Sequence, residues 1–173
     1  LNLLVKEIDP LENGTEYRYD ALRRMTSRTD ANGITTEYGY NALGWLTSVT
    51  DAANGVTTYE YDAVGNRTAI IDANGVETRF EYNFLDQLTR EINPLGNTWR
   101  YSYDARGNMI RRVDGKWQAT YYEYDKANQL TATRYGVGAG LDVAVTFEYD
   151  DNGNEIAMRD WNGLWGYEYD ELN

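Results

Sequence analysis

Carboxylates are the most numerous residues in this sequence that could do chemistry. The chain has 28 Asp and Glu residues, and two neighbouring carboxylates can serve as a general acid and a general base. It has no histidine and no cysteine, so the commonest general base and thiol nucleophiles are absent. Most of the Asp residues recur at regular intervals instead of forming one polar cluster. We therefore predict no catalytic residues and no enzyme activity.

One acidic stretch begins like a calcium-binding loop. Asp150, Asn152 and Asn154 stand at alternate positions, as the first ligands of an EF-hand loop do. Such a loop needs glycine at its sixth position and glutamate at its twelfth, where this chain has Glu155 and Trp161. The match fails at both positions, so we predict no metal and no cofactor. A weak cation site of another kind on the acidic surface stays open.

Tryptophans are the candidate ligand-binding residues. Trp45, Trp117, Trp161 and Trp165 lie beside predicted turns at uneven intervals, and they could stack on a carbohydrate or on a partner protein. We expect Trp99 and Trp165 to share one face of a sheet, and Trp45, Trp117 and Trp161 to lie at an edge or on the opposite side. The net charge of −12 argues against a nucleic-acid partner.

The tyrosines, in contrast, follow a strict repeat. An aromatic residue, a variable residue, a tyrosine and an Asx residue recur eight times, and the second tyrosine returns at first every 21 residues. The aromatic pairs are Tyr17 and Tyr19, Tyr38 and Tyr40, Tyr59 and Tyr61, Phe80 and Tyr82, Tyr101 and Tyr103, Tyr122 and Tyr124, Phe147 and Tyr149, and Tyr167 and Tyr169. Such a period indicates a repeat array, in which the rings pair across strands and have a structural role.

Turn residues punctuate the repeat about every ten positions. An Asx residue opens each turn, and a glycine that tolerates positive φ often follows three residues later. Glycines at this position include Gly33, Gly65, Gly75, Gly107 and Gly153. Each repeat therefore contains two turns and two strands of about six residues, rich in Tyr, Thr and Val. The predicted fold is all-β, with about sixteen antiparallel strands in one continuous sheet that coils into an open tube, spiral or shell segment.

The odd repeat length constrains the turns. Side chains alternate faces along a strand, so we expect one loop of odd and one of even length in each repeat. We predict a three-residue loop with a glycine bulge after each Tyr-Asp, and a loop of two or four residues at the other turn. The turn at Asp51 has one extra residue before Gly55, and we expect it to be irregular.

These periodicities also predict two different faces. We expect a buried face with the tyrosines and an exposed face with the glutamates that lie between them. Ile71, Ile92 and Val113 are placed on the tyrosine face, together with three arginines that could stack on tyrosine rings. These arginines are Arg67, Arg90 and Arg111.

The motif Tyr-x-Tyr-Asp-x-x-Gly-Asn, as in residues 59–66 and 101–108, resembles the YD-repeat or Rhs-repeat family. The chain departs from it at Arg23, Asp86 and Asn128, which replace glycine, and at a glycine-rich insertion, residues 135–142. The resemblance implies a ribbon of hairpins that spirals into a shell. In bacterial Rhs proteins and Tc toxin complexes such shells enclose a toxic C-terminal segment, whereas in teneurins a similar shell supports adhesion.

We expect residues 1–173 to form a single array of about eight repeats that is a piece of a longer shell. The predicted function is a wall segment of a large secreted or cell-surface protein, bacterial in origin, that encloses or presents a toxin or effector. The alternative is an adhesion module that binds carbohydrate or a cell-surface protein. Predicted partners are the neighbouring repeats and a second copy joined edge to edge, without membrane insertion.

Overall fold

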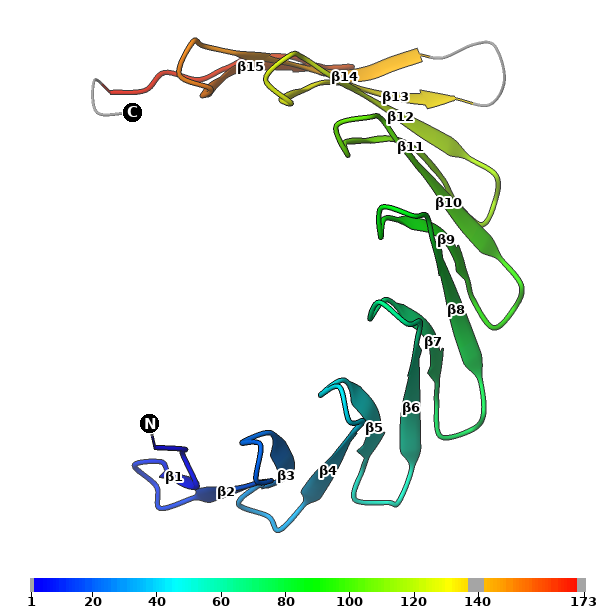
Figure 1. Cartoon of the computed structure of the whole chain (residues 1–173). Helices are drawn as coiled ribbons and strands as arrows, with labels where there is room; N and C mark the ends of the chain where they lie inside the picture. The colour runs from blue at the N-terminus through cyan, green and yellow to red at the C-terminus, as the bar shows by residue number, and fades with distance from the viewer. Residues whose placement is uncertain (1, 137–141, 171–173) are drawn as a thin grey trace. The chain divides into compact units, whose positions relative to one another are not determined.

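The computed structural model describes residues 2–136 and 142–170, and every regular element in these ranges is a β-strand. The strands follow sequence order in one antiparallel sheet, which confirms the predicted all-β fold (Figure 1). They are β1 (Lys6–Ile8), β2 (Gly14–Tyr19), β3 (Met25–Thr29), β4 (Thr35–Tyr40), β5 (Leu46–Thr50), β6 (Val56–Tyr61), β7 (Arg67–Ile71), β8 (Glu77–Tyr82), β9 (Leu88–Ile92), β10 (Thr98–Tyr103), β11 (Met109–Val113), β12 (Ala119–Tyr124), β13 (Leu130–Gly136), β14 (Asp142–Tyr149), β15 (Glu155–Asp160) and β16 (Gly163–Gly166).

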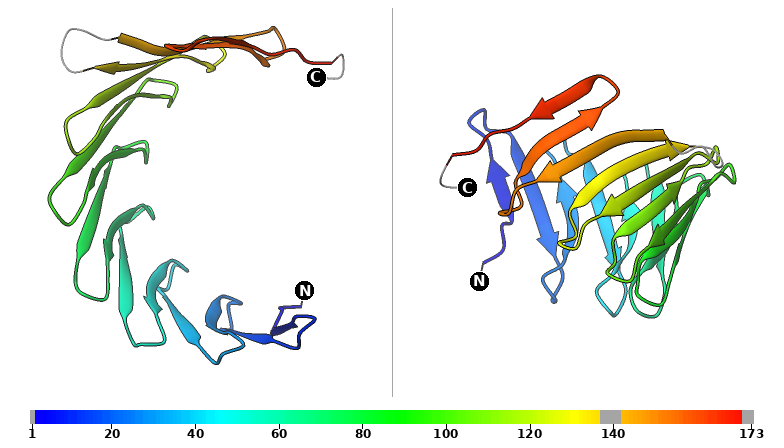
Figure 2. Two further views of the ribbon diagram at one scale, coloured as in Figure 1. Left: turned by 180° about the vertical axis from the view of Figure 1, so that it is seen from behind. Right: turned by 90° about the horizontal axis from the view of Figure 1, so that it is seen from above.

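The chain divides into two compact units, Leu1–Phe80 and Glu81–Asn173. Within each unit, successive hairpins lie side by side, as the two further views in Figure 2 show. A six-residue strand that carries the aromatic pair alternates with a five-residue return strand through most of the array. Of the predicted insertion loop, residues 137–141 lie outside the described residues, and the last tyrosine pair follows the end of β16.

The described turns that open between Asp9 and Asp150 all have one hydrogen-bonding pattern. The N–H of the fourth residue donates to the carbonyl of the opening Asx residue, and the Asx N–H donates to the carbonyl of the fifth. The fourth residue has positive φ, which is +78° at Gly33 and +103° at Gly65. This is a three-residue hairpin loop with a left-handed bulge residue. The predicted loop of two or four residues at alternate turns is therefore wrong.

The turn at Asp51 is also regular, contrary to the expectation. Asn54 takes the fourth position with φ of +63°, and its N–H donates to the Asp51 carbonyl at 3.0 Å. Asparagine tolerates this conformation better than most residues, so the following Gly55 is not needed there. The departures at Arg23, Asp86 and Asn128 likewise adopt positive φ, at +67°, +60° and +66°.

The described loops that open between Asp9 and Asp150 all have the same length, so they cannot account for the odd length of the repeat. A β-bulge in the return strand provides the extra residue. Tyr19 pairs with Met25, but Arg18 pairs with Ser27, so Thr26 is left as an extra residue. The same shift leaves Thr47 extra in β5 and Thr68 extra in β7. Because one bulge adds one residue to each repeat, the tyrosines return to the same face after 21 residues.

The bulge also changes which residues share a face. Ile71 pairs with Thr58 and Ile92 with Thr98, while Val113 pairs with Ala119. Residues directly opposite one another on neighbouring strands share a face. All three apolar residues therefore lie on the face opposite the tyrosines, which we call the glutamate face, and the prediction that placed them on the tyrosine face is wrong.

The distribution of buried residues differs from the prediction too. The most buried hydrophobic residues are Ala69, Val113, Ala132 and Ala119, and they lie on the glutamate face, while the tyrosine pairs are mostly half-buried. Ala69 pairs with Glu60 on one side and Arg79 on the other, and longer side chains of this kind can cover a small one. Neither face is a dry core, because the sheet is a single layer.

The three arginines separate between the faces. Arg67 lies on the tyrosine face, with its guanidinium carbon 5.8 Å from the Tyr59 ring centroid and 5.5 Å from that of Phe80. Arg90 instead forms an ion pair with Glu81 at 3.0 Å on the glutamate face. Arg111 stacks there on Tyr121 at 5.6 Å. The placement is therefore correct only for Arg67, because the bulge precedes the other two residues in their strands.

Candidate functional site

The second tyrosine of most pairs makes a polar contact that links hairpins. Its hydroxyl donates to a backbone carbonyl in the preceding repeat, as Tyr40 does to Met25 at 2.9 Å and Tyr61 to Leu46 at 2.8 Å. The same bond is made by Tyr19, Tyr103, Tyr124, Tyr149 and Tyr169. Pairing of β3 with β4 ends at Ser27, so the Met25 carbonyl has no strand partner on that side. The tyrosine satisfies a carbonyl that lies beyond the end of the pairing between β3 and β4.

The first ring of each pair has a different role. Tyr17, Tyr38, Tyr59, Tyr101, Tyr122 and Tyr167 share this position with two phenylalanines. The Tyr17 and Tyr101 hydroxyls make long bonds to glutamates, of 3.3 and 3.4 Å, and the Tyr101 hydroxyl also contacts Arg112. The second position has tyrosine in every repeat, Tyr82 in β8 included. Burial raises the pKa of Tyr103 above its ordinary value, which keeps this hydroxyl a neutral donor.

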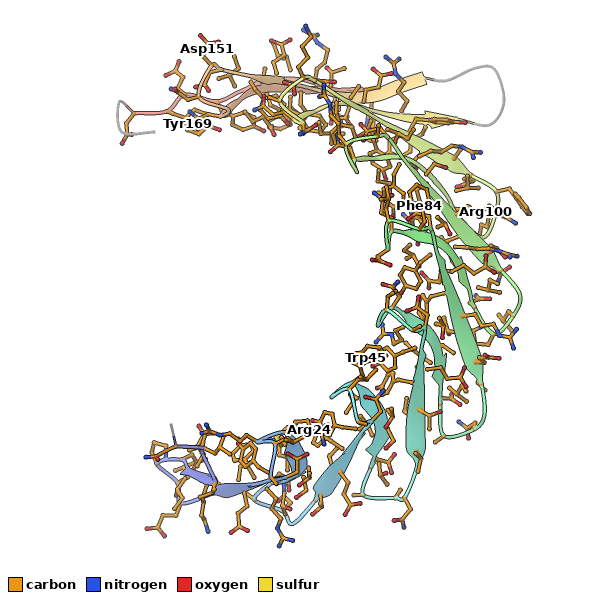
Figure 3. The ribbon with its side chains drawn as sticks, in the orientation of Figure 1. Arg24, Trp45, Phe84, Arg100, Asp151 and Tyr169 are labelled. Atoms are coloured by element: carbon orange, nitrogen blue, oxygen red, sulfur yellow. The ribbon has the colours of Figure 1, made fainter. Side chains whose placement is uncertain are left out.

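The fifth residue of each Tyr-Asp turn extends to the next such turn. Arg24 donates to the Asn41 carbonyl at 2.9 Å and lies 4.9 Å from the Tyr40 ring centroid. Trp45 occupies the next equivalent position, and both residues are labelled in Figure 3. Its ring centroid lies 5.3 Å from that of Tyr61.

The sequence had led us to expect Trp45 at an edge or on the opposite side of the sheet. The structure places it between two repeats instead. Its ring packs on Gly65, where an added Cβ would lie 2.9 Å from a ring carbon. Both Gly65 and Tyr61 belong to the following repeat, so the half-buried indole connects two hairpins. This packing explains Trp45 without a ligand.

The other three candidate tryptophans are exposed. Trp117 has φ of +66° at the fourth position of its turn, and the Arg100 guanidinium lies 4.5 Å from its ring on the glutamate face. Trp117 is 68% exposed, Trp161 78% and Trp165 54%. Trp165 pairs with Met158 on the tyrosine face, which Trp99 also shares. Trp161 and Trp165 belong to the hairpin of β15 and β16, and β13 and β14 separate that hairpin from the hairpin of Trp117.

The carboxylates of the Asp residues that open the turns accept hydrogen bonds from groups of the same turn. The Asp150 carboxylate accepts bonds from the backbone N–H groups of Asn152 and Asn154 and from the Asn154 side chain, all within 2.9 Å. The side-chain bond from Asn154, followed by its backbone bond, lowers the pKa of Asp150 below the ordinary value. In the described ranges, no group of three or more His, Cys, Asp or Glu residues is placed to hold a metal ion.

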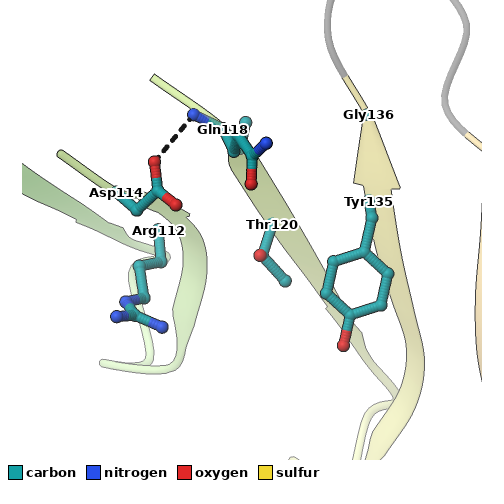
Figure 4. Close-up of a pocket in the computed structure, with 7 residues that line it drawn as sticks. Arg112, Asp114, Gln118, Thr120, Tyr135 and Gly136 are labelled. Atoms are coloured by element: carbon teal, nitrogen blue, oxygen red, sulfur yellow. Dashed lines mark hydrogen bonds between the residues drawn. The ribbon is translucent and has the colours of Figure 1, made fainter. Parts of the chain in front are cut away.

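A cleft on the tyrosine face was not predicted from the sequence. Arg112, Asp114, Gln118, Thr120 and Tyr135 line a cavity of about 460 Å³, which we call the Arg112 cleft (Figure 4). Arg112, Thr120 and Tyr135 stand directly opposite one another on β11, β12 and β13. One signal could have revealed it, because Tyr135 is a tyrosine outside the repeated pairs.

These features define a class of protein, an array of antiparallel hairpins in which tyrosine hydroxyls and turn side chains join neighbouring repeats. The family model of the RHS repeat matches residues 1–36, 24–56, 40–77, 61–85 and 82–116. The chain belongs to the RHS repeat family, which confirms the predicted resemblance. No curated protein matched the sequence.

Several solved structures are similar to this chain. The crystal structure of TcdB2-TccC3-Cdc42 has a TM-score of 0.68 and 19% identity, over 90% of this chain and 9% of that chain. A Tc holotoxin pore of Photorhabdus luminescens, with a mutated TccC3, has a TM-score of 0.67 and 20% identity. The match covers 85% of this chain and 9% of that chain. At these identities the likeness shows a shared fold, and the chain spans about a tenth of those proteins. In the described residues, no helix is long and apolar enough to cross a membrane.

Proposed function

We propose that the chain is a non-catalytic wall segment of a large secreted bacterial shell, which encloses or presents a C-terminal toxin or effector. The observation that carries this proposal is the bonding between repeats within each unit. Tyrosine hydroxyls such as those of Tyr40 and Tyr61 bond the preceding hairpin, and turn residues such as Arg24 contact the next one. Family membership and the fold shared with the Tc holotoxin pore support the proposal.

A wall of this kind must be able to lengthen by adding repeats, and the contacts between the repeats of this array allow that. Each hairpin buries its half-covered rings against neighbours, so adding one repeat lengthens the sheet by the same contacts. The Asx residues that would be candidates for catalysis are engaged in turn geometry. A structural role therefore accounts for the recurrent residues, and we propose that the array has no enzyme activity of its own.

The test uses the full-length parent protein, with an epitope in the segment that follows the array. We expect the native segment to resist limited proteolysis, and to become sensitive when Tyr61 and Tyr103 are both changed to Ala. The matched control changes Tyr59 and Tyr101 to Phe, which keeps the rings, and should retain protection. Equal digestion of the segment in the native and Tyr→Ala proteins would contradict the proposal.

Exposed tryptophans favour a second proposed function, adhesion to a carbohydrate or a cell-surface protein. The exposed indoles of Trp117 and Trp161 are of the type that dominates binding hot spots. A glycan panel should then show saturable binding that Trp161→Ala abolishes and that Leu95→Ala, at another exposed turn, does not. Binding that survives both Trp117→Ala and Trp161→Ala would count against it.

A further inference from the structure

Three residues on the tyrosine face of Glu81–Asn173 depart from the repeat and lie close together. Trp99 occupies a position that is threonine in most repeats, and Tyr135 lies outside the tyrosine pairs. Arg112 stands between their strands, directly opposite Tyr101 on β10 and Thr120 on β12. The equivalent return-strand residue is Val49 in β5, Ile70 in β7 and Arg28 in β3. Only Arg112 therefore combines a guanidinium with Trp99 and Tyr135. The array itself therefore does not need this combination.

These residues form two adjoining hollows that share Arg112, Asp114 and Gln118. The Arg112 cleft continues on its other side into a cavity of about 330 Å³ that Asn97 and Trp99 line. The Trp99 ring packs beside Gly115, where an added Cβ would lie 3.4 Å from ring carbons. An aromatic side chain thus stands on each side of one guanidinium. Volumes of this size suit a small ligand, unlike the flat contact of a large partner.

The polar groups in the cleft are of both signs. Arg112 is exposed and belongs to none of the ion pairs among the described residues. One Asp114 oxygen accepts bonds from the N–H groups of Lys116 and Gln118, at 2.8 and 2.9 Å. Within the described ranges, its other oxygen makes no hydrogen bond. A guanidinium binds carboxylate in a two-pronged manner, whereas Asp, Gln and Thr side chains suit hydroxyl groups.

We propose that the Arg112 cleft binds a carboxylated sugar, a hexuronic acid unit of an oligosaccharide. Arg112 takes the carboxylate, and Asp114, Gln118 and Thr120 bond the hydroxyls. Trp99 and Tyr135 cover the apolar faces of neighbouring rings. An acidic peptide fits less well, because its glutamate side chains have no hydroxyl groups for Asp114, Gln118 and Thr120 to bond. This site shares no residue with the exposed turn tryptophans and does not depend on the wall function.

The experiment measures binding by calorimetry to a trigalacturonate, to the neutral galactose trisaccharide and to a hexaglutamate peptide. Saturable binding is expected only for the trigalacturonate, and Arg112→Gln should weaken it by about tenfold or more, as loss of a charged hydrogen-bonding pair does. The matched control is Arg28→Gln. Arg28 also stands opposite a tyrosine and a threonine, Tyr17 and Thr36, but Thr15 replaces the tryptophan beside it.

Tyr135→Ala is a second variant that leaves every charge in place, and it should weaken trigalacturonate binding several-fold. Circular dichroism of each variant establishes that the sheet is intact. Three results would overturn the proposal: no trigalacturonate binding, equal effects of Arg112→Gln and Arg28→Gln, or hexaglutamate binding as tight as that of the sugar.

Discussion

The tyrosine hydroxyl is the residue-scale feature that explains the repeat. An aromatic ring alone would pack equally well with phenylalanine, as it does at Phe80 and Phe147. The second ring of each pair must also reach a carbonyl at the start of the preceding return strand, at distances between 2.7 and 3.1 Å. A half-buried carbonyl without a partner is costly, so this position requires a hydroxyl.

Replacing Tyr61 with Phe tests this role. The change removes the bond to the Leu46 carbonyl and should lower the free energy of unfolding by about 1 kcal/mol. Tyr59→Phe in the same strand is the control, because Phe80 and Phe147 already occupy its position, and it should be close to neutral. Urea unfolding followed by circular dichroism measures both. Equal stability of the two variants would show that the hydroxyl bond contributes nothing.

The opening Asp residues make stability depend on pH. Bonds from the side chains of Asn13 and Asn154 are the largest contributions that lower the pKa of Asp9 and of Asp150 in the folded chain. A carboxyl group with a lowered folded pKa stabilises the fold above its unfolded pKa, about 3.9 for Asp. We therefore expect the urea concentration at the midpoint of unfolding to stay constant near neutral pH, and to decrease as the pH drops below about 4.

A variant of the Asp150 turn measures the contribution of one carboxylate to the pH dependence. Asn83 bonds Gln87 through their side chains at 2.8 Å, which keeps the turn without a titrating group. Asp150→Asn combined with Asn154→Gln copies that pair, and it should reduce the loss of stability between pH 5 and pH 3. An unchanged acid dependence would mean that Asp150 does not contribute.

At the scale of elements, the bulge sets the faces of each return strand. Two turns of equal length would place the tyrosines of successive repeats on alternate faces, because side chains alternate along a strand. One extra residue, such as Thr47 in β5, restores the same face in every repeat. The tyrosine hydroxyl bonds the carbonyl of the residue just before the bulge, as that of Tyr61 bonds Leu46.

Deleting Thr47 should therefore be far more harmful than truncating it. The deletion moves Val49 away from the tyrosine face and shifts the strand by one residue, and we expect a loss of more than about 2 kcal/mol in the free energy of unfolding. Thr47→Ala keeps the bulge and should stay within about 0.5 kcal/mol of the parent. Chemical denaturation distinguishes the two, and a deletion variant as stable as Thr47→Ala would refute the role of the bulge.

At the scale of the whole molecule, β1 and β16 are the first and last strands in the order of the sheet. An outer edge of this kind presents N–H and carbonyl groups that can pair with another chain. The Tyr167 N–H bonds the Ile156 carbonyl, so the N–H of the neighbouring Gly166 points away from β15. For residues 1–173 taken by themselves, edge-to-edge association of two copies is the consequence that we predict.

Sedimentation velocity tests this association. The sedimentation coefficient should rise with protein concentration, and Gly166→Pro should reduce the rise because it removes one outward N–H. Gly166→Ala is the control, since an added Cβ there meets nothing within 4 Å. Monomers at every concentration, or equal association of the two variants, would contradict the prediction.

Much of the architecture could be predicted because it depends on local interactions. The Asx residue and the fourth residue of each turn act within five consecutive residues, and the alternation of Tyr with Glu marks a strand. Where the fourth residue is Trp117 or Arg23 the local signal is weak, yet the backbone still takes positive φ. Bonds within the turn accompany this disfavoured conformation, because the N–H groups of Arg23 and Trp117 donate to the Asp20 and Asp114 carbonyls.

The sequence by itself determined the repeat, the all-β class, the positions of the turns and the family. Only the tertiary structure decided which residues share a face, because a bulge is a property of two paired strands and leaves no mark in one strand alone. It also decided that Trp45 packs between repeats, and that Trp99, Arg112 and Tyr135 surround one cleft. Such groupings arise from pairing across strands, which the order of residues along the chain does not specify.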